Sequence, residues 1–144
     1  MEKLRLGLIG CGRISKNHFE AISQIPEAEY VAVADIIRER AEEAAKTYNI
    51  PSVYTDYHKM LDKEQLDAVS ICTPSGLHPS IGIDVANHKI NVITEKPMAI
   101  NVEGADKLIH ACDENNVQLF VVKQNRLNTT MQLLKRAVDK ERFG

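Results

Sequence analysis

Residues 4–15 read LRLGLIGCGRIS, an apolar run that ends in a glycine-rich turn. The apolar run predicts a buried β-strand over Leu4–Ile9, and the residues after the turn have the spacing of an amphipathic helix. The turn matches the dinucleotide-binding pattern G-x-G-x-x-G/A at Gly10 and Gly12, with Ser15 in place of the third glycine. Serine is still small enough for the helix to pack closely on the strand. The stretch therefore predicts a strand, a phosphate-binding turn and a helix; the plainer alternative is a glycine-rich turn without a ligand.

The rest of the chain repeats this alternation. Further strands are predicted at residues 30–34, 68–72, 90–94 and 117–122, so five strands have assigned ranges. We expect six strands in all, with Val53-Tyr54 left out as doubtful. Strands that alternate with helices form right-handed βαβ units and one parallel sheet. The predicted fold class is α/β, a doubly wound parallel sheet (Rossmann), with residues 1–144 as one dinucleotide-binding domain. Helices are predicted between and after the strands, at residues 14–25, 37–48, 55–61, 77–88, 101–115 and 128–140.

Three of these helices have recognisable starts. Thr55-Asp56, Asn101 and Asn128 each stand where a side chain can accept from the first free backbone N–H groups, so all three are predicted N-caps. The last helix carries Met131, Leu134 and Val138 on one face, which is typical of an amphipathic helix.

The composition excludes several other classes of protein. Hydrophobic residues make up 44% and charged residues 26% of the chain, as in soluble globular domains. The net charge of −2 and the absence of Trp argue against nucleic acid as a partner. No apolar stretch approaches the roughly 18 residues of a membrane helix, so we expect no membrane partner. Cys11, Cys72 and Cys112 form no CxxC pair, so we expect no disulfide framework, no metal site and a cytoplasmic location.

Asp35 follows the second predicted strand, 23 positions after Gly12. An acidic residue about 20 positions after the glycine turn binds the adenosine ribose in dinucleotide folds, and it would repel the 2′-phosphate of NADP. Asp35 therefore favours NAD as the cofactor, with Ile36 beside it in the same site. Arg38 could instead turn toward a phosphate. The plainer alternative for Asp35 is an N-cap of the next helix, which is compatible with binding ribose.

Polar residues also follow the later strands. Thr73-Pro74-Ser75 either lines the path of the cofactor or is an ordinary turn, and the residues alone do not separate the two. Lys96, in Glu95-Lys96-Pro97, could donate a hydrogen bond to a reacting oxygen. The alternative, which is the commoner one for adjacent Glu and Lys residues after a strand, is a solvated turn. Arg126 could bind a carboxylate or phosphate of the substrate beside Asn125, unless residues 123–126 are an ordinary polar loop.

Together these motifs resemble the Gfo/Idh/MocA family of oxidoreductases. The resemblance rests on residues 7–14 (GLIGCGRI), Asp35, residues 72–78 (CTPSGLH) and Glu95-Lys96-Pro97, of which the Glu-Lys-Pro triplet is the most specific. It implies that Lys96 lies beside the nicotinamide and the reacting sugar hydroxyl as the catalytic residue. His18 is expected to be a packing residue. The cofactor contacts that the resemblance implies come from Gly10, Cys11, Gly12, Arg13, Ile14, Asp35, Ile36, Thr73, Pro74, Ser75, His78, Glu95, Lys96 and Gln124.

The resemblance also implies a longer enzyme. Family members carry a C-terminal α+β domain that supplies a substrate wall, so we expect this chain to be the N-terminal cofactor domain, able to bind NAD but nearly inactive alone. The full-length enzyme is expected to be a homo-oligomer.

A narrower resemblance, at residues 13–19 and 122–126, is to the UDP-N-acetyl-glucosaminuronate 3-dehydrogenases. It implies oxidation of a nucleotide-sugar 3-hydroxyl with NAD, in the biosynthesis of surface polysaccharides, with Lys96, Asn125 and Arg126 toward the substrate. The alternatives are a dehydrogenase of another sugar or of inositol, an NADP-dependent reductase, and a non-catalytic NAD-binding regulatory module.

Overall fold

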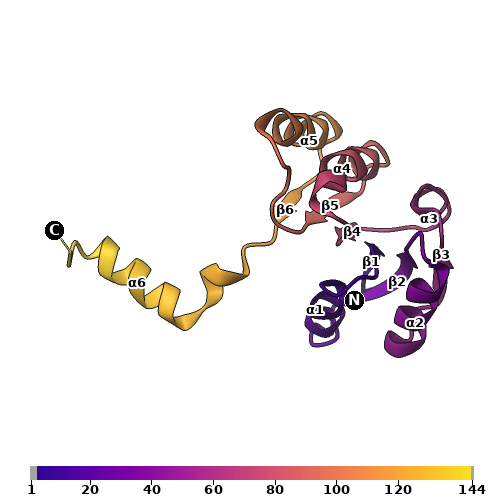
Figure 1. Cartoon of the computed structure of the whole chain (residues 1–144), viewed down its shortest axis with the longest axis horizontal. Helices are drawn as coiled ribbons and strands as arrows, with labels where there is room; N and C mark the ends of the chain where they lie inside the picture. Colours follow the sequence, from indigo (N-terminus) through magenta and orange to yellow (C-terminus); the bar gives the residue numbers. More distant parts are fainter. Residues whose placement is uncertain (1–2, 144) are drawn as a thin grey trace.

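Six strands form one parallel sheet in the computed structural model, which describes residues 3–143. The predicted domain of residues 1–144 thus runs slightly beyond the described residues at both ends. The strand order is β3-β2-β1-β4-β5-β6 (Figure 1). The chain starts in the middle of the sheet, builds one half outward, and returns to build the other half beside β1. This is the order of a doubly wound dinucleotide-binding sheet, so the predicted fold class is confirmed. The strands are β1 (Leu4–Ile9), β2 (Ala28–Ala34), β3 (Ser52–Tyr54), β4 (Ala68–Ile71), β5 (Asn91–Thr94) and β6 (Leu119–Val121).

Helices cover both faces of this sheet. Helices α1 and α2 pack on one face, and α3, α4 and α5 pack on the other (Figure 1). Short 3₁₀ turns at residues 75–77 and 124–127 follow β4 and β6. The helices are α1 (Ser15–Ile22), α2 (Arg38–Tyr48), α3 (Tyr57–Lys63), α4 (His78–Asn87), α5 (Val102–Asn115) and α6 (Thr129–Asp139).

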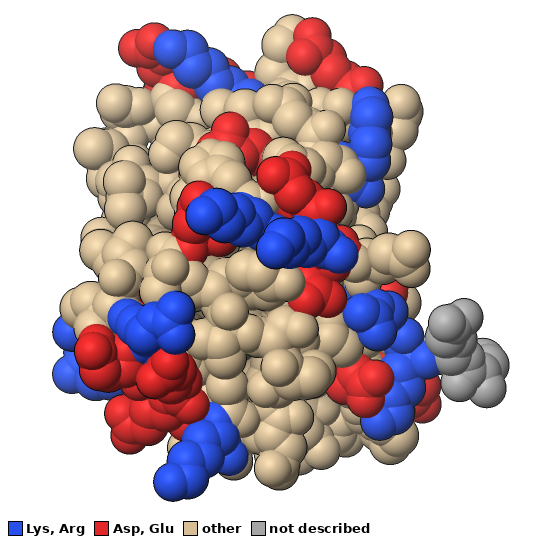
Figure 2. Space-filling model, turned by 90° about the vertical axis from the view of Figure 1, so that its right-hand side faces the viewer, with Lys and Arg blue, Asp and Glu red and all other residues tan. Residues whose placement is uncertain are grey.

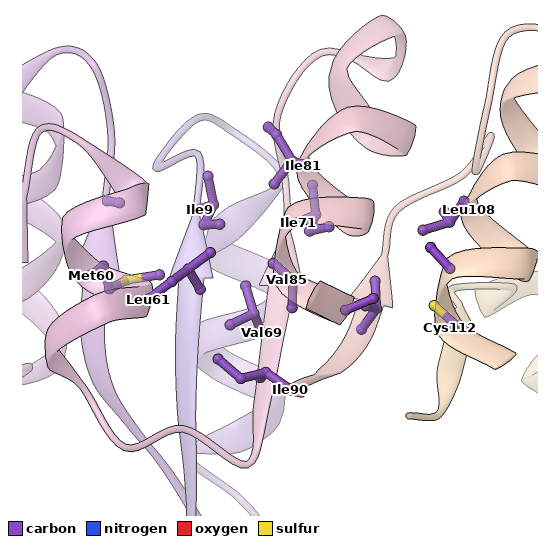
Figure 3. Packing of buried hydrophobic residues seen from close by; sticks show 14 of the residues in the cluster. Ile9, Met60, Leu61, Val69, Ile71, Ile81, Val85, Ile90, Leu108 and Cys112 are labelled. Carbon is purple, nitrogen blue, oxygen red and sulfur yellow. The ribbon is translucent and has the colours of Figure 1, made fainter. Parts of the chain in front are cut away.

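The sheet separates two hydrophobic cores. Adjacent residues of a strand point to opposite faces, so Leu8 enters the core under α1 and α2 while Ile9 enters the other. In that second core, Met60 of α3 and Val85 of α4 approach the sheet near Val69 (Figure 3). Strands buried on both faces explain why the first runs of sequence are almost continuously apolar.

Two strand predictions need correction. The count of six strands is right, but it is reached only with the stretch that was left out: β3 pairs with β2 through Val53 and Tyr54. Residues 117–122 give a strand of only three residues, because only Val92–Thr94 of β5 pairs with it. As β6 lies at the sheet edge, Phe120 is 54% exposed.

The helix caps were predicted with mixed success. The Asn101 side chain accepts from the Gly104 N–H at 2.8 Å, which confirms this N-cap of α5. Asn128 precedes α6, but its side chain makes no capping bond and donates instead to Asn125 at 3.4 Å. Asp56 caps α3 by accepting from the His58 N–H at 3.0 Å.

Helix α6 extends away from the sheet (Figure 1). None of its residues, 129–139, is buried. The predicted apolar face, at Met131, Leu134 and Val138, is therefore exposed in this structure rather than packed.

The charged surface is mixed. Basic and acidic side chains lie close together on the face shown in Figure 2, without a large area of one sign. Within residues 3–143 no helix is both long and apolar enough to span a membrane.

Candidate cofactor site and catalytic lysine

The glycine turn lies where β1 and β4 end side by side. Gly10 has φ +94°, and a Cβ placed there would lie 2.8 Å from the carbonyl carbon of Cys72 and 2.9 Å from the nitrogen of Thr73. At Gly12 a Cβ would meet no atom of residues 3–143 within 4 Å, its chain neighbours aside. Gly10 therefore lets the turn approach β4, and Gly12 leaves open space where a pyrophosphate could approach the backbone.

Ser15 is accommodated without opening the turn. Its side chain is buried, and its hydroxyl donates to the Gly12 carbonyl at 2.6 Å. The residue that departs from the glycine pattern therefore adds a bond inside the turn, as its small size allows.

Asp35 joins the end of β2 to the glycine turn. One carboxylate oxygen accepts from the Cys11 N–H at 2.8 Å, and the other accepts from the Ile37 N–H at 2.8 Å. Asp35 is not the N-cap of α2, because Ile37 holds that position without a side-chain capping bond, so the second bond only fixes the residue before the helix. The first bond ties Asp35 to the phosphate-binding turn. Arg38 does not turn toward this site, because it pairs with Glu42 on the surface of α2 at 2.9 Å.

A cavity of about 620 Å³ extends from the glycine turn past Asp35 and is called here the first cavity. Ile36 on its wall is 91% exposed, a large apolar side chain with little protein around it. Arg40, rather than Arg38, is the arginine of this wall. A carboxylate beside exposed apolar surface suits a ribose and a flat base. The remaining apolar wall includes Ile9, Ala34, Ile37, Pro74, Leu77 and Ile81.

A second cavity, of about 450 Å³, lies on the other side of the glycine turn. It is the place where the sequence motifs converge, since α1, the turn after β4 and the turn after β5 all contribute to its wall. Thr73 lines both cavities, and its hydroxyl oxygen is buried without a hydrogen-bond partner among the described residues. An unpartnered polar atom on a residue that lines both cavities fits a ligand that contacts both. The wall consists of Arg13, Ile14, Asn17, Thr73, Ser75, His78, Glu95 and Lys96.

Lys96 lies on an exposed turn at this second cavity. Its neighbour Glu95 is only 7% exposed, and the two oxygens of its carboxylate have different partners. One lies 2.9 Å from Nε2 of His18, and the other accepts from the Lys96 N–H at 3.2 Å. His18 was expected to be a packing residue, yet it makes a polar contact with the Lys96 turn.

His78 connects the two turns of the second cavity. It is 1% exposed, and its Nδ1 and Nε2 each lie 2.8 Å from a backbone carbonyl, those of Pro97 and Thr73. A neutral imidazole has one N–H, so it can donate to only one of these carbonyls at a time. His78 therefore lies between the two turns and can donate to one or the other, and its predicted contact with a cofactor stays a prediction.

Cys11 takes part through its backbone. Burial raises the pKa of its thiol from 9.0 to about 12, with a further contribution from Asp35. The thiol therefore stays protonated at neutral pH and is a poor nucleophile.

Two predicted substrate residues and one predicted cofactor residue lie elsewhere. Asn125 and Arg126, predicted for the substrate, and Gln124, predicted for the cofactor, are exposed on the 3₁₀ turn after β6, outside the walls of both cavities as far as the structure describes them. Residues 3–143 also hold no cluster of three His, Cys, Asp or Glu side chains that could bind a metal ion.

Several residues of the site were missed from the sequence, among them Thr55, Asp56, Tyr57 and His58 on the wall of the first cavity. Asn17 lies one helical turn after Arg13 and Ile14, so helical spacing could have placed it on the same wall. Arg40 stands in the first turn of α2, three positions after Ile37, and lines the first cavity with it. The pairing of His18 with Glu95 joins residues 77 positions apart and had no local signal.

Two proteins of similar sequence and fold have been solved with NADH. Residues 4–123 match the family described as "Oxidoreductase family, NAD-binding Rossmann fold" (GFO_IDH_MocA). The WlbA dehydrogenase from Bordetella pertussis, solved with NADH and UDP-GlcNAcA, has 45% identity and a TM-score of 0.96 over 99% of this chain and 44% of its own. The WlbA protein from Chromobacterium violaceum, solved with the same two ligands, has 41% identity and a TM-score of 0.96 over 100% of this chain and 42% of its own.

A curated relative has a different substrate. The myo-inositol 2-dehydrogenase of Thermotoga maritima is 30% identical over 98% of this chain and 42% of its own length. The chain thus spans less than half the length of the relatives it matches. From the family match and the geometry of the glycine turn, the chain belongs to the Gfo/Idh/MocA oxidoreductase family, as its NAD-binding Rossmann domain.

Proposed function

We propose that this chain is the cofactor-binding half of an NAD-dependent dehydrogenase that oxidises the 3-hydroxyl of UDP-N-acetyl-glucosaminuronate. The observation that carries the proposal is the position of Lys96, on the wall of a cavity that shares Thr73 with the cavity beside Asp35. The two WlbA proteins, at 45% and 41% identity, support this substrate over inositol, whose dehydrogenase is 30% identical.

The residues of the first cavity would hold the adenosine half of the cofactor. Asp35 would accept from the ribose hydroxyls and Ile36 would cover one face of the base. The backbone at Gly10, Cys11, Gly12, Arg13 and Ile14 would face the pyrophosphate, where N–H groups at a helix N-terminus favour an anion. The residues proposed for the nicotinamide half are Thr73, Pro74, Ser75, His78, Glu95, Lys96 and Gln124.

Lys96 would act on the substrate. Bound NAD+ supplies the hydride acceptor. The Lys96 ammonium would donate a hydrogen bond to the sugar oxygen and stabilise the negative charge that develops there as a base of the C-terminal domain takes the hydroxyl proton and the sugar carbon loses its hydride. Asn125 and Arg126 would serve the carboxylate or diphosphate of the substrate, with a substrate wall from a C-terminal α+β domain. We place the reaction in the cytoplasm, in the biosynthesis of surface polysaccharides, and propose that the full-length enzyme is a homo-oligomer.

The test has two stages. Calorimetric titration of the chain with NAD+ and NADP+ should give clear binding of NAD+ and weaker binding of NADP+. The full-length enzyme should then form NADH with UDP-N-acetyl-glucosaminuronate, and far more slowly with UDP-N-acetylglucosamine, which lacks the carboxylate, or with myo-inositol. Faster NADH formation with myo-inositol would favour an inositol dehydrogenase. NAD+ binding without turnover of any of the three would favour a regulatory module.

A further inference from the structure

The turn that carries Lys96 is held from both sides by histidines. On one side Nδ1 of His78 lies 2.8 Å from the carbonyl oxygen of Pro97. On the other side Nε2 of His18, from α1, lies 2.9 Å from the Glu95 carboxylate. Lys96 stands between these two anchored residues, and its side chain is exposed at the second cavity.

The contacts of these two histidines differ: His78 lies near a backbone carbonyl, and His18 contacts a side chain. His78 is almost fully buried, and its Nδ1 lies within hydrogen-bond distance of a backbone carbonyl, so this contact does not depend on a neighbouring side chain. His18 contacts a side chain, and that side chain in turn accepts from the backbone N–H of Lys96 at 3.2 Å. The position of the Lys96 backbone therefore depends on where the Glu95 carboxylate is held.

The Glu95 carboxylate needs the His18 donor. A carboxylate that is 7% exposed loses most of its hydration and must be compensated by donors. Among residues 3–143 its donors within hydrogen-bond distance are the His18 ring and the Lys96 N–H. Either the neutral tautomer with hydrogen on Nε2 or the imidazolium can donate to Glu95. Without that donor one carboxylate oxygen would be buried and unpaired, and the side chain would turn toward solvent.

We propose that His18 is a positioning residue for Lys96, acting through Glu95. By holding the carboxylate against α1, His18 keeps the Lys96 backbone N–H bonded and the ammonium directed into the second cavity. The inference rests on the proposed function in one respect, namely that Lys96 acts on the reacting hydroxyl.

The experiment compares two replacements of His18 in the full-length enzyme. His18→Gln keeps an amide N–H at a similar reach, and His18→Met keeps the volume without a donor. We expect His18→Met to lower kcat by about 10-fold to 100-fold while Kd for NAD+ changes by less than about threefold, since a small misplacement of a reacting group affects turnover most. His18→Gln should stay within about threefold of the wild type in both. The matched control is His110→Met, an exposed histidine of α5, which should change neither.

A double-variant cycle tests the route through Glu95. Once Glu95→Gln has removed the buried charge, adding His18→Met should lower kcat much less than it does in the wild-type background, because the effects of coupled residues are not additive. If the decreases in kcat caused by Glu95→Gln and His18→Met are independent of each other, the proposed route is overturned. An equal decrease in kcat for His18→Gln and His18→Met would also overturn it. If the Met variant does not fold, His18→Asn replaces it, because its shorter side chain keeps a donor that cannot reach Glu95.

A second readout separates this inference from the proposed function. In ¹⁵N-labelled chain, His18→Met should shift the Lys96 amide resonance and speed its hydrogen exchange, and His18→Gln should not. If the full-length enzyme turns over none of the three tested compounds, the proposed function fails, and the amide of Lys96 still reports whether His18 positions it. An unchanged Lys96 amide in His18→Met would overturn the inference even in an active enzyme.

Discussion

The backbone N–H of Cys11 donates to the Asp35 carboxylate at 2.8 Å, so the residue that would hold the ribose also holds the glycine turn. The other Asp35 oxygen accepts from Ile37 at the start of the next helical segment. The carboxylate is thereby fixed before any ligand arrives, which lowers the cost of ordering the site on binding.

Asp35 should set the choice of cofactor. Asp35→Asn should weaken NAD+ binding and reduce the preference for NAD+ over NADP+ by about tenfold or more, because it removes the charge that repels a 2′-phosphate. Calorimetric titration with each cofactor measures the ratio. Glu43→Ala, at an exposed acidic residue of α2, is the control and should leave the ratio unchanged. An unaltered ratio in Asp35→Asn would refute the ribose role.

Replacing the two glycines of the turn by alanine should have different effects, one on stability and the other on NAD+ affinity. Gly10→Ala places a Cβ 2.8 Å from the Cys72 backbone at positive φ, so we expect a loss of about 2 kcal/mol or more of stability and a clearly lower Tm. Gly12→Ala meets open space, so Tm should hardly change while NAD+ affinity falls. Thermal unfolding and NAD+ titration of both variants measure this contrast, and a destabilised Gly12→Ala with normal affinity would contradict it.

Lys96 should matter for turnover and little for cofactor binding. In the full-length enzyme Lys96→Ala should lower kcat by about 10²-fold or more and change Kd for NAD+ by less than about threefold. Steady-state kinetics and calorimetry give the two numbers, and Lys107→Ala on the exposed surface of α5 is the control. Unchanged turnover would remove Lys96 from the mechanism.

Alkaline pH should destabilise the domain partly through Cys11. The folded protein keeps the thiol proton up to about pH 12, whereas the unfolded thiol releases it near pH 9.0. Unfolding therefore releases a proton in this window, and the free energy of unfolding falls as pH rises from about 9 toward 12. Burial also raises the pKa of Cys72 and Tyr30, which adds to the fall. Urea unfolding at several pH values should show a shallower fall in Cys11→Ala and in Cys11→Ser; slopes equal to the wild type would contradict this origin.

The parts of the fold that could be predicted are those with a local cause. The bounds of β1 follow from an apolar run bordered by Lys3 and Gly10, and residues 4–9 were predicted without error. β3 was left out because it has three residues, none of them buried. The extent of β6 depends on how much of β5 is available to pair, which residues 117–122 do not encode.

In the site, too, the residues that could be predicted are those with a local cause in the sequence. Residues that directly follow a strand, such as Asp35 and Lys96, could be found because parallel strands deliver them to one edge of the sheet. The contact between His18 and Glu95 depends on how α1 packs beside the turn after β5, so it required the structure. For α6 the pattern predicted an apolar face at Met131 and Leu134, but a periodic pattern does not say what covers it.

The central place of β1 has a consequence for synthesis on the ribosome. β1 pairs with β2 on one side and β4 on the other, with Leu6 opposite Ala68. Until β4 has been synthesised, one edge of a strongly apolar strand has no partner, and such edges recruit other chains. Nascent chains that stop before residue 68 should therefore be the aggregation-prone species and the ones most dependent on chaperones, whereas chains released after β4 can close the middle of the sheet.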